Sequence, residues 1–372
     1  MKNRLLKIKG ILLISLLLTW GCLEQIDLEV DPEFQLNTVI QGKLVIGNPS
    51  TVFVRISRLF DFSGNGRENV LVRYVRLFDD QGNEVDLERG EVVGNYSIEL
   101  APDDPRMPIE QGRSYYIEVS TFDGNIYRSQ PETIQPVPEV TDLTYQEIQK
   151  EILGADDVLR ESPFIEFRLT TPLDAPNGDI YLRWIAERTI KLTDTPESSE
   201  VPDDGQPNKV CYITERGDLR SLPVASSTTF AGEVVDFPVY EELKNHLFSE
   251  GYVLTVYQES LSELAYNYWR DVGSLINRQG TIFEPPVGKV RSNLSNVQED
   301  GPEPFGFFYV TQQDTARIYI APEDVGNPPM RCPIPPPSTP SPGFSYCASN
   351  PVCCDCLSVP GSQLTPPDFW IE

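Results

Sequence analysis

The stretch VLVRYVRLFDDQGN, residues 70–83, is a run of β-branched and aromatic residues that ends in a turn sequence. Its first part, Val70–Phe78, is typical of a β-strand, because such side chains pack well on a pleated surface. Its last part, Asp80-Gln81-Gly82-Asn83, predicts a hairpin turn in which glycine supplies a positive φ. Thr51–Ile56 has the same composition as the first part, and Asp123-Gly124 marks a second hairpin. Short strands joined by tight turns therefore dominate this region.

The chain is predicted to be mainly β, with several segments. Residues 37–138 contain short strands with turns every 8–12 residues, which is typical of an immunoglobulin-like β-sandwich. Prolines at positions 131, 136 and 138 mark its end. Residues 139–330 predict a second β-rich domain, and residues 331–372 form a tail rich in proline and cysteine.

One amphipathic helix is predicted within the second domain, over residues 261–277. Apolar residues recur there every three or four positions and form one stripe, so we expect the helix to cover a sheet. Ser260 and Glu263 have the spacing of a capping box at its start. Tyr145–Leu159 is expected to form a second, short helix.

Composition excludes several classes of protein. The chain of 372 residues contains 33 prolines and 25 glycines, which disfavours a helical bundle. Its formal net charge of −26 argues against a nucleic-acid partner, because phosphate binding needs a basic patch. His246 is the single histidine, so sites that need two imidazoles are excluded.

The N-terminus has the pattern of an export signal. A basic segment precedes the apolar run Ile11–Leu18, which is too short to span a bilayer. A glycine then precedes Cys22, as at a bacterial lipoprotein cleavage site, so residues 1–21 are predicted to be a signal peptide. Cys22 would carry acyl chains and residues 22–36 would be a lipidated tether; an ordinary signal peptide is the alternative. Leu23, with the acidic residues after it, favours the outer membrane and an orientation towards the cell exterior.

Cysteine parity predicts a disulfide between the second domain and the tail. If Cys22 is acylated, six cysteines remain, and an exported protein meets an oxidising environment. One of the six, Cys211, lies in the second domain. The other five lie in the tail: Cys332, Cys347, Cys353, Cys354 and Cys356. Five tail cysteines cannot all pair among themselves, so Cys211 is expected to bond one of them. Adjacent Cys353 and Cys354 are not expected to bond each other.

Metal binding is the competing interpretation of the tail. Cys332, Cys353, Cys354, Asp355 and Cys356 could form a thiolate cluster, although zinc sites usually have two or more residues between paired cysteines. Disulfides are the preferred prediction, and we predict neither a metal nor any other cofactor.

The sequence indicates no catalytic residue. It has no glycine-rich phosphate loop and no Gly-x-Ser-x-Gly motif. Asp61, Ser63, Asn65 and Gly66 resemble the start of a calcium loop, but Val72 stands where a glutamate is needed. Phe305, Phe307 and Tyr309 alternate along a predicted strand, so they either form a buried face or face a ligand such as a sugar.

Several short motifs are spread along the mature chain: Gly94-Asn95-Tyr96, Gly112 with Tyr115-Tyr116, Asp123-Gly124 with Tyr127 and Ser129, Tyr268-Trp269, residues 280–286 (GTIFEPP), Asn293, Gly306-Phe307-Phe308, residues 353–356 (CCDC) and Trp370. Through these motifs nearly all of the mature chain resembles a family of Bacteroidota outer-membrane lipoproteins of unknown function, DUF4249. The resemblance implies an accessory surface lipoprotein, often encoded near TonB-dependent receptors, and it carries over no catalytic residue.

The function expected from these observations is non-enzymatic. The protein would be held to the outer membrane through Cys22 and would act as an accessory partner of a TonB-dependent receptor or another outer-membrane assembly. A module that captures a peptide or a glycan is the alternative, and an exported hydrolase is a third class.

Overall fold

The structure is a computed structural model of the whole chain. It describes residues 37–58, 70–154, 156–174, 178–195, 208–217, 222–230, 232–276, 290–298, 301–332, 347 and 350–371. The predicted signal peptide and tether lie outside these residues. Within the described ranges, no helix is long and apolar enough to cross a membrane.

Strands dominate the described residues, which confirms the prediction of a mainly β protein. In chain order the elements are β1 (Thr38–Ile46), β2 (Ser50–Arg58), β3 (Val72–Asp79), β4 (Glu84–Asp86), β5 (Glu88–Arg89), β6 (Asn95–Leu100), β7 (Ser114–Thr121), β8 (Ile126–Ser129), β9 (Glu132–Thr133), β10 (Asp142–Leu153), β11 (Leu159–Pro172), β12 (Tyr181–Thr193), β13 (Val210–Arg216), β14 (Val224–Ser226), β15 (Glu233–Leu243), η1 (His246–Phe248), β16 (Tyr252–Leu261), α3 (Glu263–Ile276), β17 (Leu294–Asn296), β18 (Phe305–Ile320), η2 (Pro322–Val325), α5 (Pro351–Cys354), η3 (Cys356–Ser358) and β19 (Ser362–Gln363).

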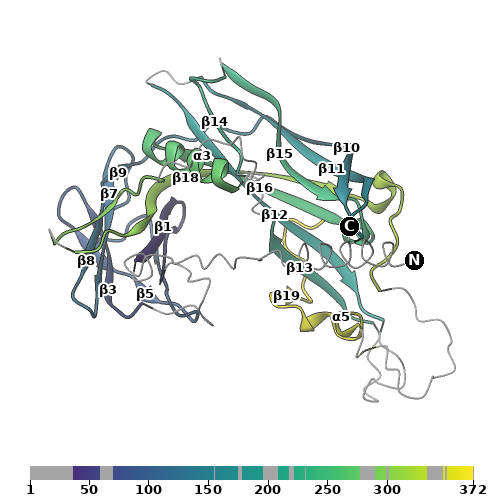
Figure 1. Cartoon of the computed structure of the whole chain (residues 1–372), viewed down its shortest axis with the longest axis horizontal. Coiled ribbons are helices and arrows are strands. Elements are labelled where there is room, and N and C mark those ends of the chain that lie inside the picture. Colours follow the sequence, from purple (N-terminus) through teal and green to yellow (C-terminus); the bar gives the residue numbers. More distant parts are fainter. Residues whose placement is uncertain are drawn as a thin grey trace, which may run out of the picture.

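The strands form three sheets. The largest has ten strands in the order β19-β13-β12-β16-β18-β1-β2-β6-β5, with β14 paired to β12. A second sheet contains β10, β11 and β15, and a third has the order β17-β8-β7-β3-β4 with β9 paired to β7. In Figure 1 the third sheet lies at the left, β10, β11 and β15 lie at the upper right, and α3 lies beside β18 between them.

Strand β18 joins the two halves of the molecule. Residues 305–312 of this strand pair in parallel with β1, whereas residues 313–320 pair antiparallel with β16. At its start Gly306 has a φ of +108°, and a Cβ there would collide with the backbone oxygen of Ile40. Glycine is therefore required where β18 approaches β1. One sheet consequently continues from the region of the predicted sandwich into the predicted second domain.

The first core lies between the third sheet and the β1, β2 and β6 part of the large sheet. It contains Leu44, Leu77 and Ile117, together with Phe308 and Val310 of β18. This two-sheet sandwich therefore includes residues beyond 138, which the sequence assigned to the second domain. Its immunoglobulin-like topology stays a prediction.

The second core packs the three-stranded sheet against the other half of the large sheet. Phe167 of β11 contacts Tyr240 and Tyr252 through ring centroids 6.0 and 5.8 Å away. The same cluster includes Cys211, Cys332, Cys353 and Cys356, so the C-terminal region belongs to the core.

The prediction of a helix over Tyr145–Leu159 is wrong. This segment forms most of β10 and reaches the start of β11, in a hairpin that pairs without a break from Asp142 opposite Thr170 to Leu153 opposite Leu159. Leu143 and Tyr145 alternate onto the second core. Ladder hydrogen bonds and this alternating burial outweigh the local preference for a helix.

The long amphipathic helix is confirmed as α3. Its cap is Ser262, whose Oγ accepts a hydrogen bond from Ala265 N at 3.1 Å. The predicted capping residue, Ser260, instead donates from its hydroxyl to Gln135 O at 2.7 Å. Both predicted hairpins are also present, with Gly82 and Gly124 at φ values of +89° and +98°.

Candidate functional site

A cavity of about 580 Å³ lies on the face of the large sheet that α3 partly covers. We call it the basic cavity. Its lining comes from six strands and the helix: Gln41, Gly42, Lys43, Phe53, Arg55, Asn95, Arg183, Ile185, Arg216, Tyr268, Trp269, Phe307 and Tyr309. Both halves of the molecule contribute to it, and the volume is within the range of small-molecule sites.

The strand register places these side chains together. Alternate residues of a strand share one face, so Lys43 lies on the same face of β1 as Gln41. Across β2, β1 and β18, Phe53 is opposite Lys43, which is opposite Tyr309. A neighbouring row places Asn95, Arg55, Gln41 and Phe307 opposite one another across four strands.

A buried carboxylate lies beside this wall. Glu259 of β16 is fully buried, and its Oε1 accepts hydrogen bonds from Lys43 Nζ at 2.7 Å and from Gln313 Nε2 at 2.8 Å. Its Oε2 accepts from the Tyr309 hydroxyl at 2.9 Å and lies 3.7 Å from Arg183 Nη1. Four partners therefore satisfy one buried charge.

These partners keep Glu259 ionised. Burial by itself would raise the pKa of this carboxyl, but the charges of Lys43 and Arg183 outweigh it and leave the pKa below its usual value. Burial, followed by the charge of Glu259, raises the pKa of Tyr309 well above its usual range. The tyrosine hydroxyl is therefore a donor to the carboxylate at neutral pH.

Helix α3 supplies an aromatic wall. The guanidinium carbon of Arg183 lies 3.4 Å from the centroid of the Trp269 ring, a cation–π contact that holds both groups. The Tyr268 ring stacks on Phe307 with centroids 4.7 Å apart. Phe307 and Tyr309 are buried, which confirms the first interpretation of their alternation, and both also line the cavity. The second interpretation, that they face a ligand, stays a prediction.

The rim carries two more guanidinium groups. Arg55 is exposed on β2, and no carboxylate of the described residues pairs with it. Arg216 lies at the end of β13, where its Nε is 3.7 Å from Glu187 Oε1. The described lining therefore contains four cationic side chains and no carboxylate.

Three buried polar atoms at this site have no hydrogen-bond partner among the described residues. They are Arg183 Nε, Trp269 Nε1 and Asn95 Oδ1. Buried polar groups are nearly always satisfied in folded proteins, and a bound water, ion or ligand is one explanation for those that are not. Their presence around one cavity supports a binding site.

All six cysteines predicted to form disulfides do so. The pairs are Cys211–Cys356, Cys332–Cys353 and Cys347–Cys354, with Cα separations of 5.9, 5.2 and 5.5 Å. Cys211 is bonded to a tail cysteine, as parity predicts, and Cys353 and Cys354 are not bonded to each other. No tail thiolate is left for the alternative of a metal cluster.

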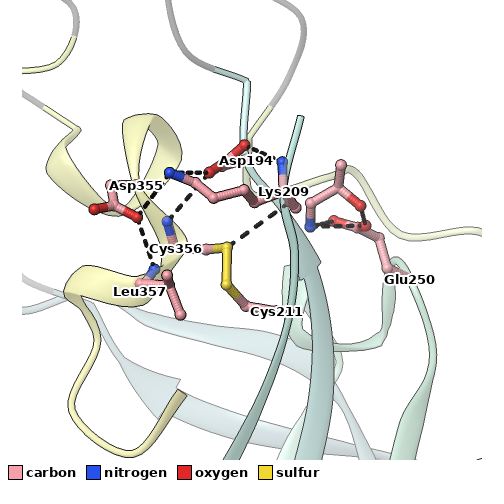
Figure 2. The surroundings of a disulfide bond; sticks show 8 residues. Asp194, Lys209, Cys211, Glu250, Asp355, Cys356 and Leu357 are labelled. Carbon is pink, nitrogen blue, oxygen red and sulfur yellow. Dashed lines mark hydrogen bonds and ion pairs between the residues drawn. A yellow bond between two sulfur atoms is a disulfide. The ribbon is translucent and has the colours of Figure 1, made fainter. Parts of the chain in front are cut away.

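Polar contacts hold the tail beside the Cys211–Cys356 bond (Figure 2). The buried carboxylate of Asp194 accepts from Lys209 N at 2.7 Å and from Cys356 N at 3.4 Å. Lys209 Nζ lies 3.1 Å from Asp355 Oδ1, and hydrogen bonding to Asp355 raises the pKa of this lysine.

Aromatic packing also fixes the end of the tail. The Trp370 ring makes edge contacts with Tyr212 and Tyr319 at centroid distances of 5.0 and 5.7 Å. Phe369 also contacts this half of the molecule, with the Arg317 guanidinium carbon 4.7 Å from the centroid of its ring.

Other residues selected from the sequence lie elsewhere. Cys22 and the Asp61–Gly66 segment are outside the described residues. His246 lies on η1 and does not line the basic cavity, and burial lowers the pKa of its imidazole. Lys43, Arg55 and Arg183 were not predicted as site residues. The signal that could have indicated them is a cationic side chain within an apolar strand of an otherwise acidic chain.

The fold and the site define a mainly β protein with three sheets, a helix-covered basic cavity and a disulfide-bonded C-terminal region. The chain belongs to the family described as "Domain of unknown function (DUF4249)", whose model matches residues 24–317. The whole lining of the basic cavity is within this match, whereas five of the six disulfide cysteines follow it.

Other comparisons add little. No curated protein matches the chain. Among solved structures, a chain described as "Biofilm associated protein - B domain" is 7% identical and covers 79% of this chain and 88% of its own length, with a TM-score of 0.12. This likeness is too low to carry an argument about fold or function.

Proposed function

We propose that the protein is an exported, lipid-anchored binding protein that captures an anionic ligand in the basic cavity. The observation that carries this proposal is the charge of the described lining, which has four cationic side chains and no carboxylate. The chain as a whole has 56 acidic and 30 basic residues, so this lining is opposite in sign to the molecule. A ligand that enters it supplies the missing negative charge.

The charges beside the cavity favour binding over hydrolysis. Glycosidases need two carboxyl groups that flank the scissile bond, one of which must be protonated. Glu259 is a single, fully buried carboxylate held ionised by Lys43 and Arg183. Its arrangement orients the two cations and does not suit an acid or a base.

The location follows from the N-terminal sequence and is supported by the cysteines. Three disulfides are typical of an exported protein in an oxidising compartment. Acylated Cys22 would then hold the protein at the outer membrane, with the cavity facing the cell exterior. Loss of membrane attachment after Cys22→Ala, measured by cell fractionation, tests this part.

Binding of small anionic probes tests the cavity. The mature protein in detergent is titrated calorimetrically with tetragalacturonate, hexaglutamate and citrate at low salt. We expect at least one probe to bind, and Arg55→Glu to weaken that binding at least tenfold. Arg89→Glu makes the same charge change on exposed β5, outside the lining, and should leave affinity within twofold. If no probe binds, or Arg55→Glu has no effect, the proposal fails.

Partnership with an outer-membrane receptor is a second candidate function, favoured by the tip of the β10–β11 hairpin. Ile152, Leu153, Val158 and Leu159 are exposed there, and grouped apolar side chains on a soluble surface often contact another protein. Purification from native membranes should recover a receptor with the wild type and lose it with Leu153→Ser plus Leu159→Ser. Equal recovery would exclude the hairpin tip as the contact.

A further inference from the structure

We infer that the ligand of the basic cavity is an anionic saccharide, bound with a carboxylate or sulfate on Arg55 and a sugar ring against Phe53. This inference rests on the proposed function and narrows its ligand class.

The centre of the wall offers no place for an extended peptide. Strands β1 and β2 each have a strand partner on both sides, so their N–H and C=O groups belong to ladders. Residues 305–312 of β18 pair with β1 alone, but on the other edge Phe308 N and O bond the Asn293 side chain and Gln312 N donates to the Ser260 hydroxyl. A peptide that binds as an added strand needs a free edge. Recognition in the cavity therefore depends on side chains, which suits a ligand rich in hydroxyl groups.

The polar side chains of one row match such a ligand. Arg55 lies between Asn95 and Gln41 across the strands. An amide both donates and accepts hydrogen bonds, as a sugar hydroxyl does, and no described residue is a partner of Asn95 Oδ1. A guanidinium group offers a planar pair of donors to a carboxylate or sulfate.

The aromatic surface lies beside this row. Phe53 is 40% exposed although its neighbours Val52 and Val54 are buried on the other face. Residues 53 and 55 are about 7 Å apart along the same face of β2, from a rise of about 3.3 Å per residue. When an anionic group of the ligand binds Arg55, the sugar ring that carries this group, or the next ring of the saccharide, is close enough to contact Phe53.

The charges of Lys43, Arg183 and Glu259 favour binding of a second anionic group of the ligand. Glu259 neutralises one of the two cations, Lys43 and Arg183, and leaves one net positive charge. The Trp269 indole N–H beside them has no acceptor in the part of the chain that the structure describes. An oligosaccharide with repeated anionic groups can reach both Arg55 and this inner cation.

Calorimetric titration with four defined probes tests the inference. Tetragalacturonate carries carboxylates, κ-carrageenan tetrasaccharide carries sulfates, maltotetraose is neutral, and hexaglutamate is an acidic peptide. We expect one of the two anionic saccharides to bind, at least tenfold more tightly than maltotetraose and hexaglutamate. The anionic saccharide that binds more tightly shows whether the cavity recognises a carboxylate or a sulfate.

Matched variants identify the contacts. Arg55→Gln should weaken saccharide binding about tenfold, through loss of a charge-assisted contact. Phe53→Ser should weaken it severalfold, whereas Phe122→Ser and Arg89→Gln, at exposed positions outside the cavity lining, should leave it within twofold. Phe53 and Arg55 are exposed, so unchanged circular dichroism will show that the variants fold.

The outcomes separate this inference from the proposed function. If hexaglutamate binds through Arg55 and neither anionic saccharide does, the saccharide inference is overturned while anion capture stands. If maltotetraose binds as tightly as the anionic saccharides, the anionic group is not recognised and the inference is overturned. If none of the four probes binds but citrate does, the saccharide inference is overturned while anion capture stands. If citrate also fails to bind, both proposals fall.

Discussion

Removal of the Cys211–Cys356 disulfide is predicted to cost more stability than removal of either other bond. The two cysteines are 145 residues apart, so the chain-entropy relation gives a contribution of about 5 kcal/mol at 25 °C. Cys347 and Cys354 are 7 residues apart, and the same relation gives about 2 kcal/mol. The difference arises because the longer loop loses more conformational freedom in the unfolded chain.

The measurement compares two double variants. Cys211→Ala with Cys356→Ala, and Cys347→Ala with Cys354→Ala, each leave no free thiol. Urea unfolding, followed by tryptophan fluorescence, should show a loss near 5 kcal/mol for the first and near 2 kcal/mol for the second. In the first variant, protease should also cut the segment after Cys356 before the rest, because the Cys332–Cys353 bond holds the tail upstream of that segment, and Trp370 packing and the short β19 pairing are weaker than the lost bond.

Equal losses for the two variants would contradict the loop-closure reasoning. A loss below about 1 kcal/mol for the first would show that the tail is ordered without its bond to Cys211. Finding Cys211 as a free thiol in the exported protein, by non-reducing peptide mapping, would refute the pairing itself.

Three further predictions concern the sheet and its buried carboxyl groups. Lys43→Met should lower the free energy of unfolding by about 2–3 kcal/mol, because it leaves the buried charge of Glu259 without its lysine partner. This loss is smaller than for a wholly buried ion pair because Lys43 is partly exposed. Adding Glu259→Gln should recover part of the loss in a double-mutant cycle. Gly306→Ala should reduce the free energy of unfolding, measured in urea, far more than Gly82→Ala. A Cβ at position 306 would collide with the backbone oxygen of Ile40, whereas a Cβ at position 82 meets nothing within 4 Å. Burial raises the pKa of Glu132 to about 7, above its unfolded value, so the folded state binds the extra proton and the free energy of unfolding should fall as pH rises from about 4.5 to 7. Glu132→Gln should flatten that slope in unfolding measured across this pH range, and an unchanged slope would contradict the assignment.

Local features of the fold could be predicted from the sequence. Strand-like runs, the glycine turns at Gly82 and Gly124 and the α3 stripe depend on neighbours a few residues apart. The pairing of Cys211 with the tail followed from parity and did not need a structure. Each of these features is encoded within a short window or by a count.

The arrangement of the large sheet could not be predicted in this way. β1 pairs with β18 more than 250 positions later in the chain, and nothing in the sequence of either strand specifies that partner. The β10 segment shows the same limit, since its pairing with β11 overrode its local preference for a helix. The basic cavity depends on these pairings, because Lys43 and Glu259 are 216 residues apart.

The candidate site was therefore predicted only in fragments. Phe307 and Tyr309 were selected by their alternation, while Arg55 and Arg183 carried no distinguishing motif. Their role emerges only when the register aligns strands from both halves of the chain.

The most direct test of anion capture is a crystal structure of the protein grown with the anionic saccharide, tetragalacturonate or κ-carrageenan tetrasaccharide, that binds more tightly in the titrations. We expect this ligand in the basic cavity, with a carboxylate or sulfate oxygen within about 3 Å of the Arg55 guanidinium and a ring against Phe53. An empty cavity at saturating ligand, or a ligand bound on another surface, would contradict it.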